Sequence, residues 1–144
     1  MTEARKLDRW DAVWAVLLGL GYLLLLLSTV WDLGYARDEG FYFQAARSYE
    51  VWFELVHTDF SRAMEPGTLD RYWAVNHEHP ALIKALFALS HRYLWSGFRL
   101  FAEQGTAYRF PAMVLSSLGV AVIYIWGARE SGRWAAWFRR CHSR

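Results

Sequence analysis

Two short polar clusters contain the residue types that could do chemistry in this chain. The first is Asp38-Glu39, and the second is the run 76–80, with the letters NHEHP. A carboxylate within hydrogen-bond reach of a substrate proton can act as a general base. Carboxylate and imidazole groups are also common metal ligands. The clusters therefore predict acid–base chemistry, with metal binding as a second use of the 76–80 run.

Each cluster also has a structural interpretation. Asp38 and Glu39 stand at the predicted start of a helix, where free backbone N–H groups favour acidic caps. The alternation His77-Glu78-His79 lacks the i, i+4 spacing of a helical zinc site. As extended chain it places the two histidines on one side and Glu78 on the other. A solvated polar loop, or a single ligand that completes a site built elsewhere, therefore fits this run better than a three-ligand metal site.

Two uncharged apolar runs, 12–31 and 110–128, must position these clusters. About 20 apolar residues are enough for a helix to cross the ~30 Å hydrocarbon core of a membrane. Pro111 stands in the expected first turn of the second helix, where its missing N–H costs nothing. Ser116, Ser117 and Gly119 predict a face of small residues for a neighbouring helix.

The aromatic content of 18% supports a membrane boundary, since Trp and Tyr prefer the membrane–water interface. Aromatic residues lie at or near the ends of both runs: Trp10, Trp14, Trp31, Tyr35, Tyr108, Trp126 and Trp134. The net charge of +2 and the lack of a basic block argue against nucleic-acid binding. The single cysteine, Cys141, excludes an internal disulfide.

Basic residues near the two runs predict the orientation. Arginine and lysine gather just outside the two runs, at Arg5, Lys6, Arg9, Arg129, Arg133, Arg139 and Arg140. Because cytoplasmic flanks carry such residues, we expect both termini, including a tail over 129–144, in the cytoplasm. The segment 32–109 then lies outside, and the first run is a retained anchor rather than a cleaved signal.

The segment 32–109 contains two amphipathic patterns. Apolar residues at helical spacing predict a helix over 39–56, lying in the membrane interface or, as the same pattern allows, on a soluble core. A second such helix is expected over 80–97, from Pro80, with Leu82 and Tyr93 on its apolar stripe and Lys84 and His91 keeping it out of the bilayer. Residues 57–76 are expected to form an ordered loop, and Gly105-Thr106 a break before the second run.

The order of these motifs resembles the N-terminal part of a polytopic GT-C glycosyltransferase. The matching motifs are 37–42 (RDEGFY), 78–82 (EHPAL) and 108–112 (YRFPA). They are similar to the D-E, H-P-P-L and R-L-P-S signatures of protein O-mannosyltransferases and aminoarabinose transferases. The resemblance covers residues 11 to about 134, with Ala81 in place of the second proline and Phe110 in place of leucine.

The resemblance implies an all-α integral membrane fold in which two transmembrane helices flank an outer loop with two juxtamembrane helices. It implies transfer of a sugar from a polyprenyl-phosphate carrier (dolichyl or undecaprenyl) to an acceptor that the sequence does not identify. Asp38 would be the general base, with Glu39 as its neighbour in the motif. His79 and Arg109 would contact substrate or carrier, and Glu78 would contribute to a divalent metal site that some members use.

Members of this family are several hundred residues long, so we expect residues 1–144 to be a single, truncated N-terminal module, inactive alone, in a bacterial plasma membrane. The alternative is a small two-span membrane protein that binds a partner or lipid headgroups without catalysis. A soluble helical protein is a third alternative, and it would purify without detergent.

Overall fold

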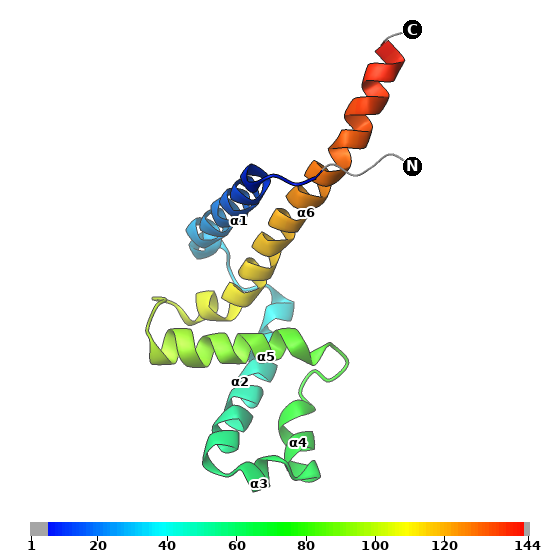
Figure 1. Cartoon of the computed structure of the whole chain (residues 1–144). Helices are drawn as coiled ribbons and strands as arrows, with labels where there is room; N and C mark the ends of the chain where they lie inside the picture. Colours follow the sequence, from blue (N-terminus) through cyan, green and yellow to red (C-terminus); the bar gives the residue numbers. More distant parts are fainter. Residues whose placement is uncertain (1–5, 143–144) are drawn as a thin grey trace. The chain divides into compact units, whose positions relative to one another are not determined.

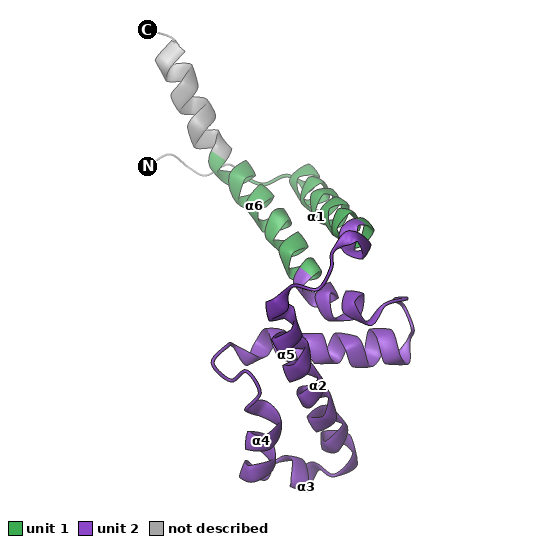
Figure 2. Ribbon diagram, turned by 180° about the vertical axis from the view of Figure 1, so that it is seen from behind, with its two compact units in different colours: residues 1–28, 113–144 green, residues 29–112 purple. Residues whose placement is uncertain are grey.

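The computed structural model describes the backbone of residues 6–142 and the side chains of residues 6–130. Every regular element in this part of the chain is a helix, which confirms the all-α expectation for these residues (Figure 1). The chain divides into two compact units (Figure 2). Unit 1 consists of residues 1–28 with 113–144, and unit 2 of residues 29–112.

Unit 1 contains the two long apolar helices. Helix α1 spans Arg9–Thr29 and is followed by the short 3-10 helix η1, Val30–Asp32. Helix α6 spans Gln104–His142, and unit 1 contains its part from Met113 onward. The segments Arg9–Asp32 and Gln104–Glu130 are long and apolar enough to cross a membrane. The side chain of Trp134, expected near the membrane boundary, lies outside the described residues.

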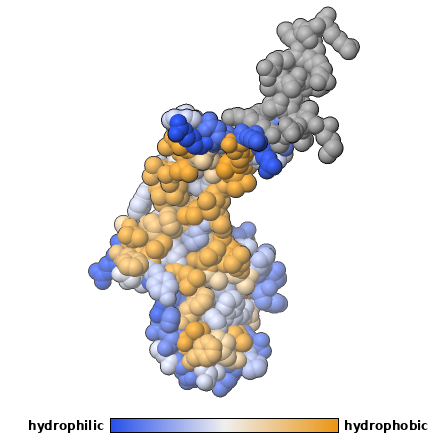
Figure 3. All heavy atoms as spheres, viewed as in Figure 1, coloured by the Kyte–Doolittle hydropathy of each residue, from blue (hydrophilic) through white to orange (hydrophobic). Residues whose placement is uncertain are grey.

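The two helices of unit 1 contact each other through small residues. A Cβ atom at Gly19 of α1 would lie 3.1 Å from the carbonyl oxygen of Ser117 and 3.5 Å from the Cβ atom of Ala121, both in α6. Gly119 has open space where its side chain would be, so the contact uses only Ser117 of the predicted small-residue face. Most of the remaining surface of the pair is apolar and exposed, as Figure 3 shows. Because a soluble core would bury such side chains, this surface favours contact with lipid.

Unit 2 is built around two helices that pack together. Helix α2 spans Arg37–Thr58, and helix α5 spans Ala81–Ser90 and continues as a π-helical turn, η2, over His91–Gly97. The start of α6 completes the unit. The core draws side chains from all three helices: Phe43, Ala46 and Tyr49 from α2, Phe87 and Ala88 from α5, and Tyr108 from α6.

The expected loop over 57–76 is wrong, because two short helices form there. Helix α3 spans Phe60–Ala63, and helix α4 spans Pro66–Trp73. The Asp59 side chain accepts a hydrogen bond of 3.1 Å from the backbone N–H of Arg62 and so caps α3. Pro66 stands at the first position of α4, which needs no N–H donor there. The proline therefore starts a helix where the sequence predicted a turn.

The expected break at Gly105-Thr106 is also wrong, because both residues lie in the first turn of α6. Pro111 is consequently inside the helix rather than in its first turn. A proline there leaves the carbonyl four residues earlier, at Ala107, without its helical partner. The Ser90 hydroxyl donates a hydrogen bond of 2.6 Å to this carbonyl, so a side chain from α5 satisfies it.

Helix α5 buries a different stripe from the one predicted. Leu82 is 72% exposed, whereas Lys84 is fully buried and His91 is buried against its neighbours. Tyr108, predicted to lie at the membrane boundary, is also buried in the core. The burial of Lys84, His91 and Tyr108 has one cause: the packing of α5 against α2 and α6 buries polar groups that the sequence pattern assigned to solvent or interface.

Candidate functional site

Three of the five residues predicted to do chemistry line one pocket of unit 2. Asp38 extends from the first turn of α2, and Glu78 and His79 come from the segment just before α5. The pocket has a volume of about 500 Å³. We call it the acidic pocket, and its lining includes Asp38, Tyr42, Gln44, Asn76, Glu78 and His79. The packing of α2 against α5 therefore brings together two clusters that lie 40 residues apart in the sequence.

The Asp38 carboxylate is exposed and makes no hydrogen bond or ion pair with the described residues. The His79 ring lies against the Tyr42 ring, with 5.5 Å between the ring centroids. Glu78 and His77 are both exposed, and their side chains approach to 3.6 Å between Glu78 Oε2 and His77 Nδ1. Asp38 is thus a carboxylate whose lone pairs are free to accept a proton inside a pocket.

The turn that carries Glu78 and His79 is held by Lys84. The Lys84 ammonium donates hydrogen bonds to the carbonyl oxygens of Asn76 and His79, the latter at 3.0 Å. Asn76 has a φ of 55°, a left-handed conformation that asparagine tolerates better than most residues. Burial lowers the pKa of Lys84. The spacing of Lys84 with Phe87, Ala88 and His91 is helical, and that spacing is the signal that could have identified Lys84 as a buried residue.

Glu39 and Arg109 form a separate ion pair rather than lining the acidic pocket. Arg109 Nε donates to Glu39 Oε1 at 2.8 Å, and Arg109 Nη2 donates to Glu39 Oε2 at 2.6 Å. The same guanidinium donates to the carbonyls of Leu33 and Gly34. The hydrogen bond from Arg109 lowers the pKa of Glu39, and the backbone N–H of Ala36 lowers it further against the effect of burial. The pair joins the starts of α2 and α6 within unit 2.

Residues 6–130 contain no group of three or more His, Cys, Asp or Glu side chains that could together hold a metal ion. The assignment of Glu78 as one ligand of a larger site stays a prediction.

Sequence reasoning missed a chain of polar side chains that runs through the buried His91 and joins α2, η2 and α6. Glu50 Oε2 lies 2.8 Å from His91 Nδ1, and His91 Nε2 lies 2.8 Å from Gln104 Nε2. Gln104 Oε1 in turn accepts a hydrogen bond of 3.4 Å from Arg47. With the Gln104 amide donating, His91 carries its proton on Nδ1 and donates to Glu50; this tautomer is assigned from the network. Only the folded helices bring these residues together, so no local sequence motif predicts their contact.

Comparison with protein-family models, with curated proteins and with solved structures finds no match to this chain. The functional argument therefore depends on the motifs of the sequence and on the geometry of the acidic pocket.

Proposed function

We propose that this chain contributes to a membrane glycosyltransferase that moves a sugar from a polyprenyl-phosphate carrier to an acceptor hydroxyl, with Asp38 as the general base. The observation that supports this most is the meeting of Asp38, Glu78 and His79 at one pocket. The motif order that resembles the GT-C family predicts the same three residues. The two long apolar helices would keep such a site near lipid-linked substrates.

The proposed reaction is a displacement at the anomeric carbon of the sugar. The acceptor oxygen bonds to this carbon while the bond from the carbon to the carrier phosphate oxygen breaks. The phosphate keeps the electron pair of the broken bond, and Asp38 takes the proton of the acceptor hydroxyl. A base must lie within hydrogen-bond reach of that proton, and the unpaired, exposed carboxylate of Asp38 is available for it.

Two other residues take supporting roles in this proposal. His79, whose ring lies against Tyr42, offers a ring surface and an imidazole at the wall of the pocket. Arg109 acts through Glu39, because their ion pair fixes the first turn of α2, where Asp38 begins. Arg109 serves as a positioning residue in this proposal, and its predicted contact with the carrier phosphate stays a prediction.

The substitution Asp38→Asn tests the proposed base. Membranes that contain the glycosyltransferase to which this chain contributes are supplied with undecaprenyl phosphate carrying a radiolabelled hexose or pentose, and labelled product is counted. We expect Asp38→Asn to lower turnover by about 10²-fold or more while binding of the carrier lipid is retained. The matched control is Asp70→Asn, at an exposed acid of α4 that does not line the acidic pocket.

Two outcomes would contradict the proposal. Unchanged turnover in Asp38→Asn would show that the base assignment is wrong. If the wild-type membranes transfer no sugar from any carrier, the non-catalytic alternative is favoured, in which the chain binds a partner or lipid headgroups. The exposed apolar surface of α1 and α6 fits that alternative equally well.

A further inference from the structure

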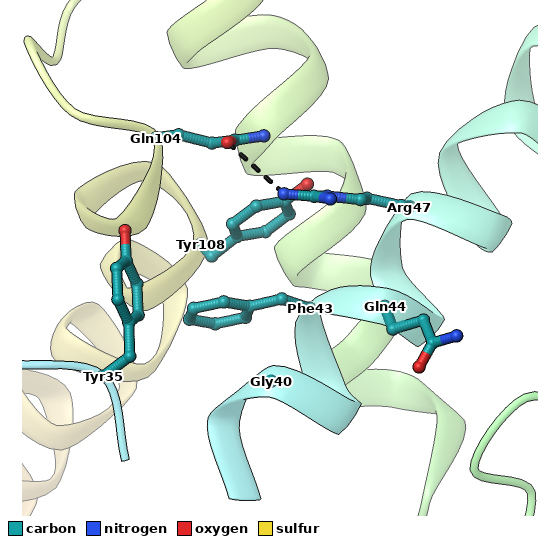
Figure 4. A pocket seen from close by; sticks show the side chains of 7 residues that line it. All are labelled: Tyr35, Gly40, Phe43, Gln44, Arg47, Gln104 and Tyr108. Atoms are coloured by element: carbon teal, nitrogen blue, oxygen red, sulfur yellow. Dashed lines mark hydrogen bonds between the residues drawn. The ribbon is translucent and has the colours of Figure 1, made fainter. Parts of the chain in front are cut away.

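A second pocket lies along another part of α2 and differs in chemistry from the acidic pocket. Its volume is about 400 Å³, within the usual range for small-molecule sites. Figure 4 shows its side chains, which come from α2, from α6 and from the segment before α2. We call it the aromatic pocket, and the residues that line it are Tyr35, Gly40, Phe43, Gln44, Arg47, Gln104 and Tyr108.

The aromatic floor of this pocket is fixed by stacking. Phe43 and Tyr108 stack with 4.7 Å between their ring centroids, and Tyr108 stacks on His91 at 4.4 Å on its other face. Tyr35 meets Phe43 edge-on at 5.8 Å. Because Phe43 and Tyr108 are buried and stacked, they give the pocket a rigid apolar floor, and the exposed ring of Tyr35 is the aromatic surface that a ligand can reach.

The one charged side chain that lines this pocket is Arg47. Within residues 6–130, Arg47 has no carboxylate partner, and its hydrogen bond to Gln104 is long, at 3.4 Å. Arg92 and Arg109, by contrast, are paired with Glu54 and Glu39. An exposed guanidinium without a carboxylate partner, beside an apolar floor, can bind an anionic group bidentately.

The hydroxyl of Tyr108 supplies a second observation. It is buried and makes no hydrogen bond of normal geometry in the described part of the chain, although the side chains of Arg47 and Gln104 lie close to it. In Figure 4 the hydroxyl points toward the end of the Arg47 side chain. A buried donor without a partner is costly, so a bound oxygen between these two groups would satisfy both. Arg47 is exposed and its hydrogen bond to Gln104 is long, so in this inference a phosphate that binds the guanidinium would draw it away from Tyr108 and expose the hydroxyl.

We infer that the aromatic pocket binds a phosphate ester with a ring-containing or apolar body, its phosphate on Arg47 and Tyr108 and its body against Phe43 and Tyr35. A tetrahedral phosphate has oxygens for both the guanidinium and the hydroxyl, whereas a carboxylate uses both of its oxygens on the guanidinium alone. Neither Asp38, Glu78 nor His79 lines this pocket, although Gln44 lines both pockets. The binding test below measures no sugar transfer, so its failure is distinguishable from failure of the proposed function. A soluble phosphate ester and a lipid phosphate headgroup have this chemistry in common.

Titration calorimetry on the full chain in a neutral detergent tests the site, with phenyl phosphate as the probe. We expect phenyl phosphate to bind at least tenfold more tightly than inorganic phosphate or phenol, because only the ester uses both the charge and the rings. Arg47→Gln should weaken binding about tenfold or more, and Tyr108→Phe, which keeps the ring stack, severalfold. Arg62→Gln, at an exposed arginine of α3 that does not line the pocket, should leave binding unchanged.

Arg47→Lys is a more conservative variant. It keeps the positive charge but removes the planar guanidinium, so it should bind phenyl phosphate with intermediate affinity. Thermal unfolding of each variant shows whether the fold is retained. The source of the phosphate is read by competition with phosphatidic acid added to the micelles. Displacement of phenyl phosphate identifies a lipid headgroup, and no displacement identifies a soluble ester. The inference is overturned if a folded Arg47→Gln binds phenyl phosphate as wild type does, or if inorganic phosphate binds equally well.

Discussion

At the scale of single residues, the adjacent acids Asp38 and Glu39 have different environments. Glu39 accepts hydrogen bonds from Arg109 and from the backbone N–H of Ala36, so it does cap α2 as the sequence predicted. Asp38 caps nothing and lines the acidic pocket. One residue of the motif therefore stabilises the helix start, and the other remains available for chemistry.

The Glu39–Arg109 pair predicts acid sensitivity of unit 2. Because Arg109 lowers the pKa of Glu39, the folded state holds the carboxylate more strongly ionised than the unfolded state does. The stabilisation is present above the unfolded pKa, which is near the model-peptide value of ~4.3, and is lost as pH falls through the lowered folded pKa. We expect Glu39→Gln to lower the free energy of unfolding at pH 7 by about 1–2 kcal/mol.

The measurement is thermal unfolding in detergent between pH 7 and pH 3. The difference in unfolding temperature between wild type and Glu39→Gln should disappear as the pH falls below about 4. Glu65→Gln, at an exposed acid whose side chain makes no cap hydrogen bond, is the matched control and should follow wild type throughout. An equal difference between Glu39→Gln and wild type at both pH limits would contradict the electrostatic account.

Which residues the sequence could identify depended on whether their partners were local. Asp38 and Glu78 stand in short motifs beside predicted helix starts, so the sequence identified them as candidate site residues. Lys84, His91 and Tyr108 are buried by contacts with distant helices, and a lysine or histidine in a sequence ordinarily indicates solvent. The partners that make their burial tolerable are the carbonyls of the 76–79 turn for Lys84, and Glu50 and Gln104 for His91.

At the scale of elements, the long apolar runs and the amphipathic patterns predicted helices where the structure forms α1, α2, α5 and α6. The helix boundaries predicted from proline and glycine residues were less accurate. Pro66 starts a helix, and Pro111 stands inside one because Ser90 satisfies the carbonyl that it frees. Gly105 lies in the first turn of α6, where the Tyr35 ring packs so closely that a side chain would overlap it. In each case a tertiary contact determined whether the helix continues, and the local sequence pattern does not predict such contacts.

The contact between α1 and α6 can be tested by two glycines of the same helix. A side chain at Gly19 would press on the backbone carbonyl of Ser117, which cannot move without shifting α6, whereas one at Gly21 meets nothing within 4 Å. We expect Gly19→Val to destabilise the helix pair by roughly 1–3 kcal/mol through overpacking. Gly21→Val makes the same change of helix propensity without the clash, so it should have a much smaller effect. Thermal unfolding in detergent measures both, and equal effects of the two substitutions would contradict the close contact.

At the scale of the whole molecule, the division into units follows the distribution of apolar residues. Unit 1 holds the two apolar helical segments, and unit 2, residues 29–112, nearly coincides with the segment 32–109 that the sequence predicted to lie outside the membrane. Unit 2 has its own aromatic core and both pockets. The chemistry of this chain is therefore concentrated in a unit distinct from the helices that would anchor it.

This division predicts a labelling pattern in right-side-out membrane vesicles. In a Cys141→Ser background, single cysteines are placed at Leu7, Glu65 and Arg129, and a membrane-impermeant maleimide is added. Because arginine and lysine flank both apolar segments on the side of the termini, we expect Glu65→Cys to react at once. Leu7→Cys and Arg129→Cys should react only after the vesicles are permeabilised. If Leu7→Cys and Arg129→Cys differ from each other, only one of the two apolar helices crosses the membrane, and the reactivity of Glu65→Cys shows which one. If all three react alike before permeabilisation, unit 2 and the ends share one side, and a site that uses lipid-linked substrates from outside the membrane is contradicted.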